Sequence, residues 1–362
     1  MAQSFIEQQT SYYFKAAESR LSETEVCRLI LAEELGERKI IEIILEHLES
    51  MPSMPVPFGD DVSALDIGNG RLAVIKTDML VGKTDVPPGM DPWQAARKAV
   101  VMNISDLAAK GVRPAALLAS VGIPKNFTKR QIEQIGKGLN SGAREYDTYV
   151  LGGDTNESSD LVISCTAFGV VEERLLMTRS GTQPGDFVAV TGLFGKTSCG
   201  LKVILEDFSA SPNMKNAFLA SVLLPKARLE EGLALADTRA VTASIDSSDG
   251  LAWCLHELAK ASDTGFLVDQ LPVAPETQEF AKMYDLDPVE LSLYGGEEYE
   301  LTVTVKPALW EEAKEAVEEV GGALIKIGKA TEKKTLVLEV NEKEIPIEPR
   351  GWEHFKQSRS SV

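Results

Sequence analysis

The feature that most restricts the fold of this chain is the alternation of strand-like and helix-like runs up to about residue 175. Short apolar runs at 72–76, 115–123 and 161–171 predict strands. Helical spacing of apolar residues predicts helices at 91–110 and 128–146, opened by capping residues and, for the first, stopped by a glycine. Strands alternating with helices are typical of an α/β domain, in which helices cover a sheet.

A second unit begins after the turn Pro184-Gly185-Asp186. A strand is expected at 187–191, and later strands continue through about residue 347. Three helices are expected in this unit, at 198–206, 225–236 and 250–261. No low-complexity segment or long linker separates the two halves, so the sequence predicts two compact α/β domains packed together.

Composition excludes several classes of protein. The formal net charge of −18 argues against nucleic-acid binding, which needs basic patches to displace counterions. No run of eighteen apolar residues occurs and the start of the chain is polar, so we expect no membrane span, no secretory signal and a cytoplasmic location. Three histidines cannot build a histidine-rich metal site, and four cysteines without paired spacing predict buried thiols rather than a disulfide framework.

Aspartates beside small residues recur at predicted strand ends and in the loops that follow them. They are Asp61 after Gly59-Asp60, Asp78 after Thr77, Asp154 after Gly152-Gly153, and Asp246 and Asp249 around Ser247-Ser248. Each alone has an ordinary explanation as a turn former or helix cap. Together they favour a ligand site, because small neighbours admit phosphate oxygens and carboxylates supply the oxygen ligands that Mg²⁺ prefers.

Asp106 differs because it lies inside the predicted helix 91–110. It shares one helix face with Ala99 and Asn103. A carboxylate on such an apolar helix must reach water, form an ion pair or bind a metal. Lys110, four residues later, is the basic residue at helical spacing that could pair with it, so both interpretations stay open.

The segment Gly195-Lys196-Thr197 follows a predicted strand and precedes a helix, as in a phosphate-binding P-loop. The full motif needs a glycine five residues before Gly195, and that position holds Val190. A P-loop is therefore not indicated, and a glycine-rich helix start that packs tightly or contacts phosphate is preferred.

These motifs, in this order, resemble the thiamine-monophosphate kinase family, within the superfamily of aminoimidazole ribonucleotide (AIR) synthetase. The matching segments are 59–61, 77–78, 103–107, 152–155, 179–181, 184–186, 190–192, 246–250, 295–301 and 351–355. The resemblance covers residues 35–355 and implies a two-domain PurM-like α/β (α+β) fold. It implies a helical extension at 1–34, an N-terminal ATP- and Mg²⁺-binding domain at 35–175 and a C-terminal α/β domain at 176–362. In the family the N-terminal mixed sheet forms a barrel with the sheet of a second copy, and nucleotide lies between the domains.

The same resemblance assigns roles residue by residue. The positions implied for several Mg²⁺ ions are Asp61, Thr77, Asp78, Asp106, Asp154, Asp246 and Asp249. Those implied for ATP are Gly153, Asp154, Arg179 and Ser248, and those for the thiamine substrate are Asp85, Glu298 and Trp352. The implied reaction is ATP-dependent phosphorylation of thiamine monophosphate to thiamine diphosphate by direct in-line transfer, in a homodimer. The acceptor phosphate is already ionised, so no histidine base is required.

Two departures from the family pattern concern the acceptor. Asp85 stands at the position of a substrate-contacting histidine, and Lys76 replaces a small residue before Thr77. The Lys76 ammonium either substitutes for one peripheral ion or points away from the site. One alternative is an ATP-dependent enzyme of the superfamily acting on a different acceptor, and a second is a cation- or partner-binding protein without turnover.

Overall fold

The computed structural model describes residues 30–355, so most of the extension predicted at 1–34 lies outside the described residues. The chain divides into two compact units. The first unit combines Met1–Glu49 with Glu353–Val362, and the second is Ser50–Trp352. The described part of the first unit contains the short helices α2 (Ala32–Leu35) and α3 (Glu37–Leu45). In this unit the His354 amide donates a hydrogen bond to the Glu37 carboxylate at 3.1 Å. All strands described below belong to the second unit.

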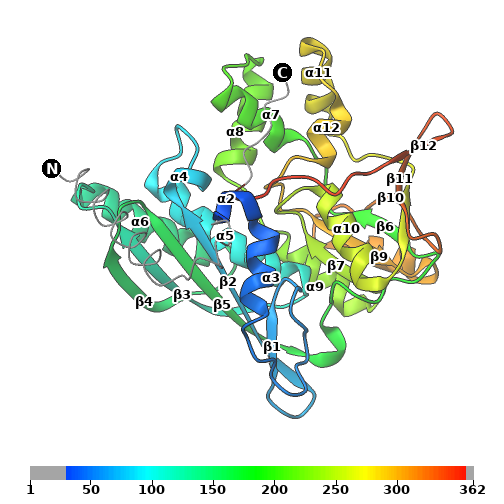
Figure 1. The fold of residues 1–362 in the computed structure, drawn as a ribbon, viewed down its shortest axis with the longest axis horizontal. Helices are drawn as coiled ribbons and strands as arrows, with labels where there is room; N and C mark the ends of the chain where they lie inside the picture. Colours follow the sequence, from blue (N-terminus) through cyan, green and yellow to red (C-terminus); the bar gives the residue numbers. More distant parts are fainter. Residues whose placement is uncertain (1–29, 356–362) are drawn as a thin grey trace, which may run out of the picture. The chain divides into compact units, whose positions relative to one another are not determined.

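A five-stranded sheet comes first in the second unit (Figure 1). Its strands are β1 (Ser63–Asp66), β2 (Arg71–Val81), β3 (Pro114–Ile123), β4 (Val150–Glu157) and β5 (Val162–Glu172). The spatial order is β1-β2-β5-β3-β4, and all neighbours are antiparallel except the parallel pair β3 and β4. Between β2 and β3 the chain forms the single turn α4 (Gly82–Asp85) and the long helix α5 (Pro92–Ala109).

Capping chemistry fixes where the two long helices begin. The Asp91 side chain accepts from the Gln94 amide, and the Asp91 amide donates to the Gln94 side-chain oxygen, which completes a capping box at α5. Thr128 and Gln131 make the same exchange at α6 (Lys129–Glu145). Both predicted helices are confirmed. At Gly138 of α6 an added Cβ would lie 2.2 Å from the Trp93 carbonyl oxygen, so glycine allows the two helices to pack closely.

A seven-stranded sheet follows, with the order β12-β11-β8-β10-β6-β9-β7. Its strands are β6 (Phe187–Val190), β7 (Val241–Asp246), β8 (Gly265–Val268), β9 (Leu301–Val305), β10 (Ile325–Thr331), β11 (Leu336–Val340) and β12 (Lys343–Pro346). The helices in this region are α7 (Lys196–Leu205), α8 (Pro212–Leu223), α9 (Leu229–Thr238), α10 (Leu251–Ser262), α11 (Pro275–Tyr284), α12 (Pro288–Leu293) and α13 (Trp310–Glu319). The predicted helix at 225–236 begins later, at Leu229, and the 3-10 turns are Glu173–Leu175 and Pro307–Leu309.

Helix α5 packs against both halves of this unit. It contacts β2 and β5 of the first sheet, and also β7, β9 and α9 of the second half. Fourteen of its residues are buried, most of them alanine, valine and other small side chains. A polar side chain on this helix is therefore enclosed whichever way it points, and must find a partner inside the protein.

Two sequence predictions about strand ends are wrong. The strand predicted at 72–76 continues to Val81 as β2, so Thr77 and Asp78 lie inside a strand that pairs with β5 along its whole length. The predicted loop after Leu151 is part of strand β4, which pairs with β3 from Val150 to Glu157. Local composition signalled turns, but backbone hydrogen bonds to neighbouring strands outweighed it.

The mixed α/β architecture with two sheets confirms the predicted fold class. Cys165, Cys199 and Cys254 are buried free thiols as expected, whereas Cys27 lies outside the described residues. Among the helices of residues 30–355, none has the length and apolar character needed to cross a bilayer. The domain boundaries drawn after residues 34 and 175 stay predictions.

Candidate functional site

Three buried carboxylates from separate segments converge in the second unit. Asp61 lies in the loop before β1, Asp106 near the end of α5, and Asp246 at the last position of β7. Each is about 5% exposed or less, and one potential ligand atom from each lies within 4.8 Å of the others. Close carboxylates in a buried setting repel one another unless a cation or a proton compensates them.

Burial changes the ionisation of two members of this carboxylate cluster. It raises the pKa of Asp246 to about 7, and the nearby Asp61 carboxylate adds to that rise. A hydrogen bond from the Ser105 hydroxyl to Asp246, at 2.7 Å, acts in the opposite direction. Burial also raises the pKa of Asp106 well above its usual value, although the Lys76 ammonium opposes that rise.

Lys76 places an ammonium group among these carboxylates. Its Nζ lies 3.1 Å from Asp106 Oδ2 and 3.3 Å from Asp78 Oδ1. Burial acts to lower the pKa of Lys76, but the surrounding carboxylates, led by Asp106, raise it above its usual value. Asn103 fixes the same region, because its side chain accepts from the Asp78 amide and donates to the Ala99 carbonyl. Of the two orientations open from the sequence, Lys76 takes the one inside the site.

Lys110 pairs with the Asp60–Asp61 loop rather than with Asp106. Its Nζ lies 2.7 Å from a carboxylate oxygen of each of these two aspartates and donates to the Ser244 carbonyl. Arg179 completes the arrangement with bonds to Asp61, to the Gly59 carbonyl and, through its amide, to Asp60. Burial tends to raise the pKa of Asp61, but these two cations lower it to about 2.

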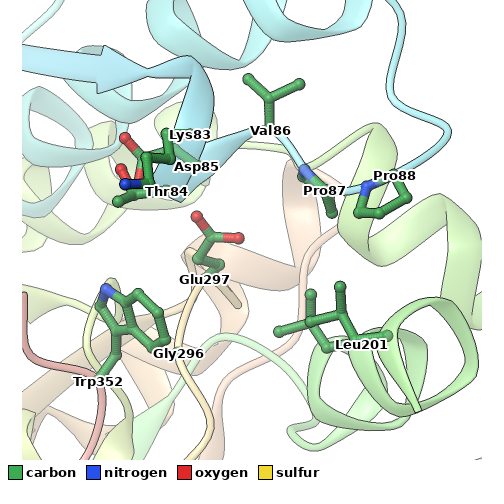
Figure 2. A pocket seen from close by; sticks show the side chains of 11 residues that line it. Lys83, Thr84, Asp85, Val86, Pro87, Pro88, Leu201, Gly296, Glu297 and Trp352 are labelled. Atoms are coloured by element: carbon green, nitrogen blue, oxygen red, sulfur yellow. The ribbon is translucent and has the colours of Figure 1, made fainter. Parts of the chain in front are cut away.

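A cavity of about 250 Å³ lies beside the end of β2 (Figure 2). It is lined by Lys83, Thr84, Asp85, Val86, Pro87, Pro88, Leu201, Leu205, Gly296, Glu297 and Trp352. In Figure 2 the Glu297 carboxylate points into the cavity, between the Trp352 ring and the segment that carries Asp85. Lys98 of α5 holds two walls together, since its ammonium donates to the Asp85 carbonyl and to Glu297.

The residues implied for substrate do not all reach this cavity. Asp85 and Trp352 line it, and the Asp85 carboxylate accepts a 2.7 Å bond from the Val81 amide. Glu298 lies elsewhere: its carboxylate accepts from the Gly195 and Thr197 amides at the start of α7. That contact also explains the Gly195-Lys196-Thr197 segment, whose free amides are occupied by a carboxylate of the protein itself.

The other implied residues lie outside the buried carboxylate cluster. Thr77 donates to the Cys165 carbonyl, and the Thr166 hydroxyl lies 3.1 Å from its own. Gly153 and Asp154 lie on the exposed edge strand β4. At Gly153 a Cβ would lie only 1.7 Å from the Ala119 carbonyl oxygen, which gives this glycine a packing role. Their metal and nucleotide roles stay predictions.

Ser248 and Asp249 belong to the loop between β7 and α10. The Ser248 carbonyl accepts from the Glu297 amide, and the Asp249 carbonyl accepts from the Trp352 amide. These bonds attach the loop to two residues of the cavity wall. The implied ATP contact of Ser248 and the implied metal role of Asp249 remain predictions.

The sequence did not indicate the positioning roles of three residues. Ser105 positions Asp246, Asn103 positions Asp78, and Lys98 positions Glu297. A usable signal was present for Lys98, because it is a lysine among the alanines and valines of the predicted helix 91–110. No sequence signal distinguishes Glu297 from its neighbour Glu298.

The carboxylate cluster suits magnesium by its chemistry. Hard oxygen ligands from Asp61, Asp106 and Asp246 approach one another in a buried space, where burial raises the pKa of Asp246 and so disfavours its ionised form. A divalent ion would stabilise that form.

Comparison with known proteins agrees with these observations. The family model for the N-terminal domain of AIR synthase related proteins matches residues 59–171, and the C-terminal model matches 183–341. Thiamine-monophosphate kinase of Nitrosopumilus maritimus is 34% identical over 322 residues, covering 89% of this chain and 99% of that protein. The Pyrococcus horikoshii enzyme of the same name is 34% identical over 324 residues, with coverages of 89% and 97%.

Solved structures show the same relationship. The structure of AaThiL complexed with AMPPCP and TMP superposes with a TM-score of 0.78 at 27% identity, covering 90% of this chain and 99% of that one. Thus the sequence motifs, the two-sheet fold and the relatives agree. This chain belongs to the thiamine-monophosphate kinase family of AIR synthase related proteins.

Proposed function

We propose that this chain transfers the γ-phosphoryl group of ATP to the phosphate of thiamine monophosphate, which yields thiamine diphosphate and ADP. The observation that carries the proposal is the buried cluster of Asp61, Asp106 and Asp246, whose members come from both halves of the fold. The names of the relatives supply the acceptor, and the AaThiL complex with AMPPCP and TMP supports the pairing of an ATP analogue with that acceptor.

The chemistry asks the protein for positioning and charge compensation rather than for a base. An oxygen of the acceptor phosphate attacks the γ-phosphorus of ATP, the bond to the bridging oxygen breaks, and ADP leaves with that oxygen. The attacking oxygen is already ionised at neutral pH. Bound Mg²⁺ would neutralise charge on the reacting phosphates.

Individual residues would divide this work. We propose that Asp61, Asp106 and Asp246 hold Mg²⁺ at the buried cluster. Asp78, Thr77, Asp154 and Asp249 would contribute to further ions. Arg179, anchored on Asp61, adds a fixed positive charge beside the cluster, and with Gly153, Asp154 and Ser248 it forms the proposed ATP contacts.

The cavity beside β2 is the proposed acceptor site. Thiamine carries a cationic aromatic ring, and the cavity offers an indole from Trp352 and a carboxylate from Glu297. Because Lys98 holds Glu297 in place, Lys98→Met should raise the KM for thiamine monophosphate more than it lowers kcat. An equal loss in kcat with unchanged KM would place Lys98 outside acceptor binding.

A homodimer through the first sheet is proposed as well. One face of that sheet exposes apolar side chains, namely Ile75, Met79, Leu118, Leu151, Phe168 and Val170. This apolar face, interrupted by Thr77 and Thr166, favours burial against a second copy. Met79→Lys should lower the mass measured by light scattering to that of a monomer, and a wild-type protein that is already monomeric would refute the dimer.

The decisive experiment for the activity is incubation with ATP, Mg²⁺ and thiamine monophosphate, followed by chromatography for thiamine diphosphate. Asp106→Asn and Asp154→Asn should abolish product while circular dichroism stays unchanged. Wild-type rates in either variant would contradict its assigned role. No product with this acceptor, together with ATP consumption on a ribonucleotide, would favour the alternative enzyme of the superfamily. We also propose a cytoplasmic location, which fractionation of cells would test.

A further inference from the structure

The Lys76 side chain enters the carboxylate cluster from a fixed position. Strand β2 pairs with β5 through Lys76 itself and with β1 through the preceding residue, so the backbone is held on both edges. The side chain is 18% exposed, and its Nζ bridges Asp78 and Asp106. Because Asp106 is itself part of the buried trio, the ammonium lies directly beside the oxygens that would bind metal.

The charges of the surrounding groups leave a place for this cation. Five carboxylates belong to the buried cluster or contact its lysines: Asp60, Asp61, Asp78, Asp106 and Asp246. Lys110 and Arg179 both bind the Asp60–Asp61 side, so among residues 30–355 Lys76 is the cation in contact with the Asp78–Asp106 side. Arg179 also contacts Glu257 at 3.7 Å. In the ionised form that binds metal, these six carboxylates and three cations leave three formal negative charges, and removal of Lys76 would leave four.

We propose that the Lys76 ammonium is a built-in replacement for one divalent cation, so that this site binds one metal ion fewer than the same aspartates would bind without it. The inference rests on the proposed function, because it assumes that these aspartates hold Mg²⁺. An ammonium within 3.3 Å of both Asp78 and Asp106 occupies the space in which an ion bridging these two carboxylates would lie. It also repels any ion that approaches them.

The arrangement has a functional consequence. A covalently attached cation is present at every metal concentration, whereas a bound ion dissociates when the metal becomes scarce. In the metal-free protein, Lys76 therefore keeps Asp78 and Asp106 compensated. We expect the fold around β2 and α5 to depend less on Mg²⁺ than it would with a small neutral residue at this position.

The test counts metal ions directly. Mn²⁺ is used as the probe in equilibrium dialysis, with free Mn²⁺ measured by electron paramagnetic resonance, on the full chain without nucleotide or acceptor. At the same saturating free Mn²⁺ concentration, Lys76→Ser should bind one more ion per chain than the wild type. Lys76→Arg keeps the charge and should bind the wild-type number. Lys125→Ser is the matched control, since Lys125 is an exposed lysine distant in sequence whose ion pair within the described residues is with Glu157.

A second measurement covers the case in which Lys76→Ser is poorly folded without metal. The rise in Tm on replacing EDTA with Mg²⁺ should be larger for Lys76→Ser than for the wild type and for Lys76→Arg. Equal ion counts and equal Tm rises in all three proteins would overturn the inference. Neither measurement depends on catalytic turnover. A failure to form thiamine diphosphate would therefore refute the proposed function without deciding this inference.

Discussion

Replacing Lys110 with methionine should strongly destabilise the metal-free protein. The side chain is fully buried, and its ammonium contacts Asp60, Asp61 and the Ser244 carbonyl at 2.7 Å each. Methionine keeps most of the length but leaves the two aspartates with Arg179 as their remaining cationic partner. The perturbation therefore removes charge compensation from a buried loop while changing the packing little.

Two considerations give the magnitude. Removing one partner of a buried ion pair costs about 3–5 kcal/mol, because the other charge stays buried. Burial raises the pKa of Asp61, yet Lys110 and Arg179 lower it from 3.8 to about 2, which corresponds to about 2 kcal/mol of net stabilisation after the cost of burial. Asp60 loses its contact as well, so we expect a loss of about 3 kcal/mol.

Urea unfolding in EDTA at neutral pH measures this loss. Lys129→Met, in an exposed pair with Glu133, is the control and should change stability by less than about 0.5 kcal/mol. In a double-mutant cycle Lys110 should couple to Asp61 and not to Asp106. A Lys110→Met loss below about 1 kcal/mol, or coupling to Asp106 instead, would refute the assigned ion pairs.

The loss of stability at acid pH offers a check on the same interaction. Because the folded pKa of Asp61 lies below its unfolded value, its contribution is present above pH 4 and is lost as the pH falls through about 2. In Lys110→Met the free energy of unfolding should decrease less over this pH range than in the wild type. An unchanged acid profile would mean that Lys110 contributes little to the ionisation of Asp61.

Glu298→Gln keeps the oxygen that caps α7 but removes a buried charge. Burial raises the pKa of Glu298 from 4.5 to about 7, so the wild type should lose stability relative to the variant as the pH rises through this range. The difference in free energy of unfolding between the two proteins should reach at most about 3 kcal/mol by pH 8, and less because Glu298 is partly exposed. A pH dependence of the free energy of unfolding, measured with urea, that is the same in both proteins would contradict this. Gly153→Ala should lower Tm because its Cβ would meet the Ala119 carbonyl at 1.7 Å, whereas Gly152→Ala, with 3.9 Å to its nearest atom, should not. Equal Tm values for both alanine variants would show that β4 adjusts freely.

Local signals in the sequence located the long helices well. Caps and prolines act within a few residues of one another, so the starts of α5 and α6 follow from Asp91 and Thr128 with little help from the rest of the chain. The strands β2 and β4 were less predictable. Their lengths depend on pairing with strands distant in sequence, and glycines or aspartates that suggest turns are tolerated inside them.

By itself the sequence determined the two-domain α/β pattern and the set of aspartates, because periodicity and motif order are properties of neighbouring residues. Only the tertiary structure decided how charges pair. Helical spacing made Lys110 a possible partner of Asp106, but Lys110 contacts Asp60 and Asp61, and Lys76 from another element lies beside Asp106. Helical spacing shows which side chains of one helix are close enough to form an ion pair. The choice among them depends on which opposite charges the packed elements bury together, and that is fixed only when α5 is enclosed by β2, β7 and the loop before β1.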